Sequence, residues 1–109
     1  MLKILLVLFF LLNGGLYADV TLLISPATGS VMPCGEPTRF FGYANDDVDG
    51  DISSRVQWSN GDTGYSVFYR WSCGGKGLGL QAVSATVINS QGQTVTETVF
   101  VTIKKKNGK

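Results

Sequence analysis

The sequence predicts an all-β protein, a sandwich of about seven short antiparallel strands that follows a cleavable signal peptide. Apolar and polar residues alternate through most of the chain after residue 19, and turn residues recur about every 8 to 12 positions. No stretch has a convincing helical period. We therefore expect two sheets that bury their inner faces against each other.

The first 18 residues have the parts of a secretory signal peptide. Lys3 gives a positive start, residues 4–12 are an unbroken apolar run, and Ala18 supplies a small residue before a cleavage site. The run is shorter than the about 20 apolar residues that span a bilayer. We expect a secreted or periplasmic protein, cut after Ala18, with no stable membrane insertion after cleavage. An uncleaved membrane anchor is the alternative.

The rest of the chain divides into strands and turns. Pro26 ends the first strand, and glycines beside Asn, Asp or Ser mark the later turns. The expected strands are residues 20–24, 38–45, 55–59, 65–71, 80–88 and 93–104. The expected loops and turns are residues 28–36, 46–54, 60–62, 72–79 and 89–92.

Successive side chains on a strand point to opposite faces, so each strand has an inward and an outward set. The expected inward residues are Phe40, Gly42, Ala44, Val56, Trp58, Val83, Ala85, Val87, Val95, Val99, Val101 and Ile103.

The aromatic strand at residues 65–71 has side chains on both faces. If Val67, Tyr69 and Trp71 face the core, then Phe68 and Arg70 face the other way. Exposed aromatic rings stack on sugars or anchor a protein partner. The sequence therefore offers a candidate binding surface, with the alternative that these rings fill space under the glycine-rich loop. Its residues are Tyr65, Phe68 and Arg70.

The chain contains two cysteines, Cys34 and Cys73. Export places them in an oxidising compartment, where paired cysteines usually form a disulfide. Such a bridge closes a loop of about 40 residues and stabilises the fold by about 3 to 4 kcal/mol in the chain-entropy model. Two free thiols are the alternative, and a redox role is disfavoured because no C-x-x-C spacing occurs.

Charge and composition exclude some functions. The chain has nine Lys and Arg and eight Asp and Glu, and loss of Lys3 with the signal leaves them balanced. Lysines gather only in a basic tail, residues 105–109, and just before it, so nucleic acid is not an expected partner. The chain has no histidine, the usual general base and a common metal ligand. We expect no enzyme.

Four aspartates, Asp46, Asp47, Asp49 and Asp51, lie close together in one loop. Oxygen ligands at alternating positions with a glycine for the turn suit calcium, so these four are candidate ligands. The alternative is structural, because aspartates cap turns by accepting hydrogen bonds from nearby backbone N–H groups. Asn89 is expected near this loop if the fold brings the two turns together.

The run F-x-G-x-A-x-D-x-x-D-G-D-I-S-x-x-V-x-W-S-x-G at residues 40–61 resembles the first half of bacterial immunoglobulin-like domains of the PKD and cadherin-like type. The run V-S-A-T-V-I-N-S-Q-G at residues 83–92 resembles their penultimate strand and turn. The resemblance implies an immunoglobulin-like β-sandwich over residues 19–104, with the two cysteines in loops at the same end. The chain departs from the pattern at Asn89, where these domains usually carry an acidic residue.

These features together predict an exported, non-catalytic immunoglobulin-like module for protein or glycan binding, or for a structural role in the cell envelope. The first alternative is a calcium-dependent adhesion or carbohydrate-binding domain. The second is a small secreted hydrolase or enzyme inhibitor.

Overall fold

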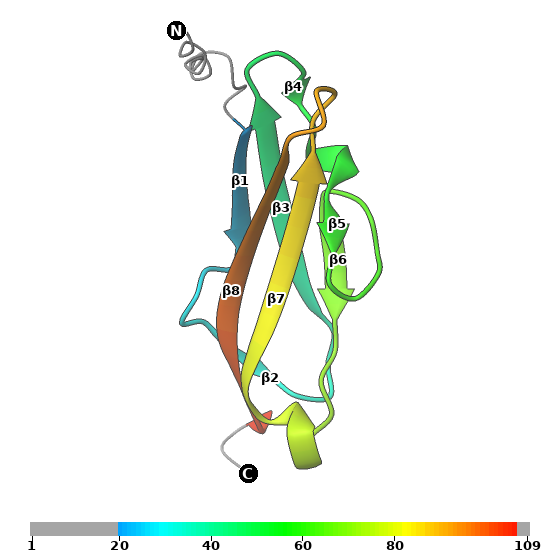
Figure 1. Ribbon diagram of the computed structural model, residues 1–109. Helices are drawn as coiled ribbons and strands as arrows, with labels where there is room; N and C mark the ends of the chain where they lie inside the picture. Colours follow the sequence, from blue (N-terminus) through cyan, green and yellow to red (C-terminus); the bar gives the residue numbers. More distant parts are fainter. Residues whose placement is uncertain (1–19, 107–109) are drawn as a thin grey trace, which may run out of the picture.

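A computed structural model describes residues 20–106 (Figure 1). The described chain forms two four-stranded sheets that pack against each other, which confirms the all-β class and the two-sheet architecture. The predicted signal peptide, residues 1–18, lies outside the described residues, as do residues 107–109 of the predicted basic tail.

The first sheet is built around its longest strand, β3 (Thr38–Asp46). β1 (Val20–Ser25) pairs antiparallel with one edge of β3. β6 (Ser66–Tyr69) pairs antiparallel with the first part of the other edge, and β4 (Gly50–Asp51) pairs with the last two residues of that strand. The outer face of β3 therefore lies between side chains of β1 and β6.

The second sheet has the strand order β2-β8-β7-β5. β7 (Gly79–Ile88) and β8 (Thr94–Lys104) form its long antiparallel ladder, and β5 (Gln57–Trp58) pairs antiparallel with β7. β2 (Val31–Pro33) runs parallel to the end of β8. This parallel pair corrects two expectations, since residues 31–33 were predicted as loop and every strand as antiparallel.

Two strands are shorter than predicted. Of residues 55–59 only β5 pairs with a neighbouring strand of the sheet, and residues 53–55 form the 3₁₀ turn η2 (Ser53–Arg55). The chain then turns back on itself, because the Gly64 N–H donates to the Val56 carbonyl and the Trp58 N–H to the Asp62 carbonyl. Of the predicted strand 65–71, only β6 pairs with β3.

The buried core is nearly the one that the alternation of apolar and polar residues predicts. The inward residues of β3, β5 and β7 are all buried, whereas Val95 and Val99 of β8 are half-buried. Gly42 lies directly against the Trp58 indole, since a Cβ at this position would be 3.0 Å from the ring atom Cζ2. The Phe40 ring meets the Tyr69 and Trp71 rings edge to face, at centroid distances of 5.4 and 6.2 Å.

The predicted disulfide is present. Cys34, just after β2, bonds to Cys73, in the loop that precedes the 3₁₀ turn η3 (Gly75–Gly77). A backbone hydrogen bond of 2.8 Å from Gly35 N to the Trp71 carbonyl holds the same two segments together. At this end Lys106 pairs with Glu36 at 2.6 Å.

Candidate binding surface

The outer face of the first sheet carries aromatic side chains. On β3, the inward residues Phe40, Gly42 and Ala44 alternate with outward-facing Arg39, Phe41 and Tyr43. The Phe41 and Tyr43 rings lie stacked with an interplanar angle of 17°. Tyr43 is 57% exposed, so β3 presents a ring surface to solvent.

The neighbouring strands extend this surface. Strand pairing places Leu23 of β1 opposite Tyr43 and Phe68 of β6 opposite Arg39. Leu23 is 62% exposed and Phe68 is 55% exposed. Tyr65, just before β6, is exposed beside the middle of β3, where its carbonyl accepts a hydrogen bond from Gly42 N. We call the resulting surface the aromatic face, defined by Leu23, Arg39, Phe41, Tyr43, Tyr65 and Phe68.

Arg39 links two strands of the aromatic face. Its guanidinium carbon lies 5.3 Å from the Phe41 ring centroid and 5.2 Å from the Phe68 ring centroid. Its Nη2 donates a hydrogen bond to Ser66 Oγ at 3.3 Å. Each cation–π contact at an exposed site contributes about 0.5 to 1 kcal/mol. Arg39 is therefore held between two rings with its charge in solvent.

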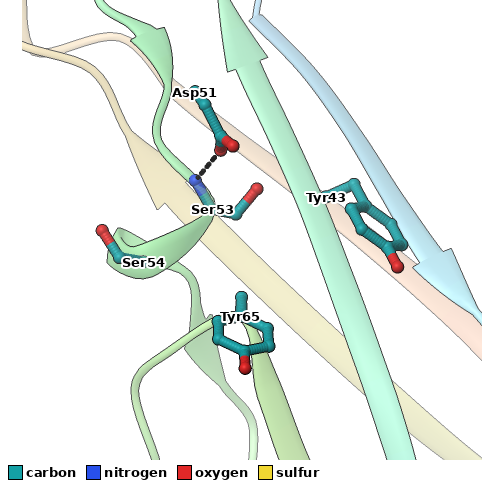
Figure 2. A pocket seen from close by; sticks show the side chains of 5 residues that line it. All are labelled: Tyr43, Asp51, Ser53, Ser54 and Tyr65. Carbon is teal, nitrogen blue, oxygen red and sulfur yellow. Dashed lines mark hydrogen bonds between the residues drawn. The ribbon is translucent and has the colours of Figure 1, made fainter.

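Two shallow depressions open beside Tyr43. The first, of about 360 Å³, is lined by Tyr43, Tyr65, Asp51, Ser53 and Ser54. Figure 2 shows Tyr43 on one side of the β3 ribbon, and Asp51, Ser53, Ser54 and Tyr65 on the other. These residues come from β3, β4, η2 and the segment before β6.

The second depression, of about 250 Å³, lies toward β1 and shares Tyr43, Asp51 and Ser53 with the first. Its other lining residues are Thr21, Leu23, Ala44 and Asn45. Because three lining residues are common to both, the two depressions are adjacent, and we refer to them together as the hollow. The hollow combines ring faces with hydroxyl, amide and carboxylate groups.

Among residues 20–106, Asp51 is the one carboxylate that lines either depression. Its Oδ1 accepts a 2.9 Å hydrogen bond from the Ser53 backbone N–H, and this bond lowers the pKa of the Asp51 carboxyl. Asp51 is therefore a charged acceptor at neutral pH.

The structure separates the predicted binding residues. Tyr65 and Phe68 are both exposed, but Tyr65 lies beside Tyr43 whereas Phe68 lies beside Arg39. Arg70 is also exposed and lies one residue beyond the end of β6. The sequence analysis missed most of the aromatic face, although outward alternation on residues 38–45 was a signal for part of it. The missed residues are Leu23, Arg39, Phe41 and Tyr43.

Asp46 and Asp49, two of the candidate calcium ligands, hold turns together. Asp46 Oδ2 accepts hydrogen bonds from the backbone N–H groups of Val48 and Asp49, at 2.9 and 2.8 Å, and Asp46 Oδ1 accepts one from the Asn89 amide at 2.9 Å. The Asn89 bond is the main cause of the lowered Asp46 pKa. These contacts fit turn capping and place Asn89 beside the loop.

Asp49 reaches across to the turn after β7. Its carboxylate accepts from Ser90 N and Ser90 Oγ at 2.7 and 2.6 Å and pairs with Arg55 at 3.0 Å. The Ser90 hydroxyl bond contributes most to the lowered pKa of Asp49. Asp47 and Asp51 are both exposed. Within residues 20–106, no three His, Cys, Asp or Glu side chains are grouped to hold a metal ion.

The described part of the chain contains no helix with the length and apolar character needed to cross a membrane. Comparisons with protein-family models, curated proteins and solved structures gave no match.

Proposed function

We propose that this chain is an exported, non-catalytic immunoglobulin-like module that binds glycan chains on its aromatic face. The observation that carries the proposal is the hollow around Tyr43, where exposed rings and polar groups lie side by side.

The strand order supports an immunoglobulin-like topology. In a constant-type immunoglobulin domain, strands A, B, E and D form one sheet and C, F and G the other. With β1, β3 and β6 as A, B and E, and with β5, β7 and β8 as C, F and G, the two sheets follow this order. β2 then continues strand A on the second sheet, and residues 59–65 connect C to E where strand D would lie.

The chemistry of the hollow suits a sugar ring. A pyranose has apolar C–H faces, which stack on aromatic rings, and a rim of hydroxyl groups, which need hydrogen-bond partners. Tyr43 and Tyr65 supply ring surfaces, while Asp51 supplies a charged acceptor. Small-molecule sites typically combine an apolar lining with a few placed polar groups in this way. The second depression extends the contact beyond one unit.

The same residues support binding without cleavage. Glycoside hydrolysis generally requires two carboxyl groups, one of them a protonated acid. In the part of the chain that the structure describes, Asp51 is the one carboxyl group that lines the hollow, and the lowered pKa of Asp51 keeps it ionised at neutral pH. The disulfide supports export, because such bonds persist in oxidising compartments.

Protein binding is the second candidate function. Leu23 is an aliphatic side chain without a ring to stack on a sugar, yet it is more exposed than its neighbour Tyr43. Large exposed apolar side chains that lie together are typical anchors of protein interfaces.

A glycan array probed with the processed, oxidised protein tests the proposal. We expect binding to at least one glycan, with losses of about 10-fold or more for Tyr43→Ala and for Phe68→Ala, since stacked rings contribute most of such contacts. Phe100→Ala is the matched control, because Phe100 is 45% exposed on the outer face of the other sheet. No binding to any glycan, or equal losses for Phe68→Ala and Phe100→Ala, would overturn the proposal.

A further inference from the structure

Arg39 on β3 and Arg70, the residue that follows β6, have no carboxylate partner in the described chain. Residues 20–106 contain two ion pairs, Arg55 with Asp49 and Lys106 with Glu36. Neither includes Arg39 or Arg70. The contacts of the Arg39 side chain are all neutral: the rings of Phe41 and Phe68 and the hydroxyl of Ser66.

We propose that the ligand of the aromatic face is an acidic glycan, whose carboxylate or sulfate groups bind to Arg39 and Arg70. This inference rests on the proposed glycan-binding function and specifies the substrate class. An exposed charge without a partner is complementary to a ligand of opposite charge, and a guanidinium matches the geometry of a carboxylate or sulfate with two parallel hydrogen bonds.

The Arg39 side chain is preorganised for such a ligand. The Phe41 and Phe68 rings flank the guanidinium, and the Ser66 hydroxyl holds one of its nitrogens. A side chain already fixed in one position loses less conformational freedom when it binds. The ring of an acidic sugar has Phe68, 55% exposed, as a stacking surface beside this charge.

Charged residues of opposite sign lie at the two ends of the aromatic face. Arg39 precedes Tyr43 by four residues on β3, which corresponds to about 13 Å along an extended strand. Asp51 lies at the Tyr43 end and repels a carboxylate or sulfate there. We therefore place an acidic unit at Arg39 and Phe68 and an uncharged unit in the hollow beside Tyr43.

Paired probes that differ in charge test this inference. Polygalacturonate is compared with its fully methyl-esterified form, hyaluronan with its methyl ester, and dextran sulfate with dextran, by affinity electrophoresis of the oxidised protein. We expect retention by at least one acidic probe and at least 10-fold weaker retention by its uncharged counterpart. We also expect the acidic interaction to weaken with added salt.

Arg39→Gln removes a charge from the aromatic face, Arg70→Gln removes one just beyond the end of β6, and Lys76→Gln removes one from an exposed site on η3. Arg39→Gln is expected to weaken acidic binding roughly 10- to 100-fold, the range for loss of a charge-assisted hydrogen bond. Arg70→Gln is expected to weaken it less, and Lys76→Gln to change it less than 2-fold. Unchanged thermal melting of each variant excludes misfolding as the cause.

Failure of the acidic-ligand inference and failure of the glycan-binding proposal give different results. Equal retention by acidic and uncharged probes, or retention by uncharged probes alone, overturns the acidic ligand and leaves the glycan proposal standing. Equal losses for Arg39→Gln and Lys76→Gln indicate attraction by net charge and also overturn it. If none of these probes and no glycan on the array binds, both proposals fall.

Discussion

The buried carboxylate of Asp46 accepts a hydrogen bond from the side-chain amide of Asn89, 43 residues further along the chain. Asp46 ends β3 in the first sheet, and Asn89 follows β7 in the second. Asp46 is only 1% exposed, and its other oxygen accepts hydrogen bonds from two backbone N–H groups of its own turn. The bond therefore fixes the two sheets to each other at the end opposite the disulfide.

Replacing this amide by a second carboxylate tests the bond. We expect Asn89→Asp to lower the free energy of unfolding at pH 7, because two carboxylates then meet in a buried position and one of them has to be protonated. The difference from the natural chain should shrink as the pH is lowered toward 4. Urea unfolding at several pH values measures it, and an equal or greater stability of Asn89→Asp at pH 7 would contradict the assignment.

Acid should destabilise the fold through the three aspartates with lowered pKa values, Asp46, Asp49 and Asp51. A folded-state pKa below the unfolded value stabilises the protein above the unfolded pKa, which is about 4 for aspartate. This stabilisation is lost as the pH falls through the folded pKa. We expect a steady urea midpoint from pH 7 to about pH 5 and a fall below about pH 4. Asp49→Asn should be less stable at pH 7 and less sensitive to acid, and a midpoint that rises on acidification would refute the account.

The disulfide joins residues 39 apart in sequence. In the chain-entropy model a closed loop of this length stabilises the folded state by about 4 kcal/mol. We expect the double variant Cys34→Ser, Cys73→Ser to unfold at a clearly lower urea concentration than the oxidised protein. The reduced natural chain is the control, since it lacks the bond but keeps both sulfur atoms. If all three forms unfold at the same midpoint, the bridge contributes no stability.

Close packing of β3 on Trp58 predicts that Gly42 does not tolerate a side chain. A Cβ there would lie 3.0 Å from Trp58 Cζ2 and 3.2 Å from Val56 Cγ1. Gly42→Ala should therefore cost about 1 to 3 kcal/mol of stability, as overpacking of a core usually does. Gly74→Ala is the control, because a Cβ at Gly74 meets nothing within 4 Å and its φ is −138°. Equal melting temperatures for the two variants would disprove this packing.

The sequence predicts the core because alternation is a local property. Val56 and Trp58, for example, were assigned inward by their spacing alone, and both are buried. β2 was missed because it has three residues, ends in a proline and pairs with one neighbour only, so no pattern of its own marks it. A parallel pairing with β8 is a long-range property that spacing within residues 28–36 does not contain.

For the candidate site, too, local features were predictable from the sequence and contacts between distant strands were not. The exposure of Phe68 follows from alternation within its own strand. The contact of Phe68 with Arg39 depends on β6 pairing with β3, which joins residues nearly 30 positions apart and depends on the whole topology. The hollow beside Tyr43 likewise needs β4 and η2 to lie next to β3. Sequence alone identified single members of the aromatic face, and strand pairing assembles them.

An NMR titration of the ¹⁵N-labelled, oxidised protein with the glycan that binds most tightly on the array tests the aromatic face most directly. The account predicts that the largest amide shift changes lie on β1, β3 and β6, at residues such as Leu23, Arg39, Tyr43 and Phe68. The amides around Phe100 on the opposite sheet should change little. Changes centred on β7 and β8, or spread evenly over both sheets, would contradict the claim that the aromatic face is the binding surface.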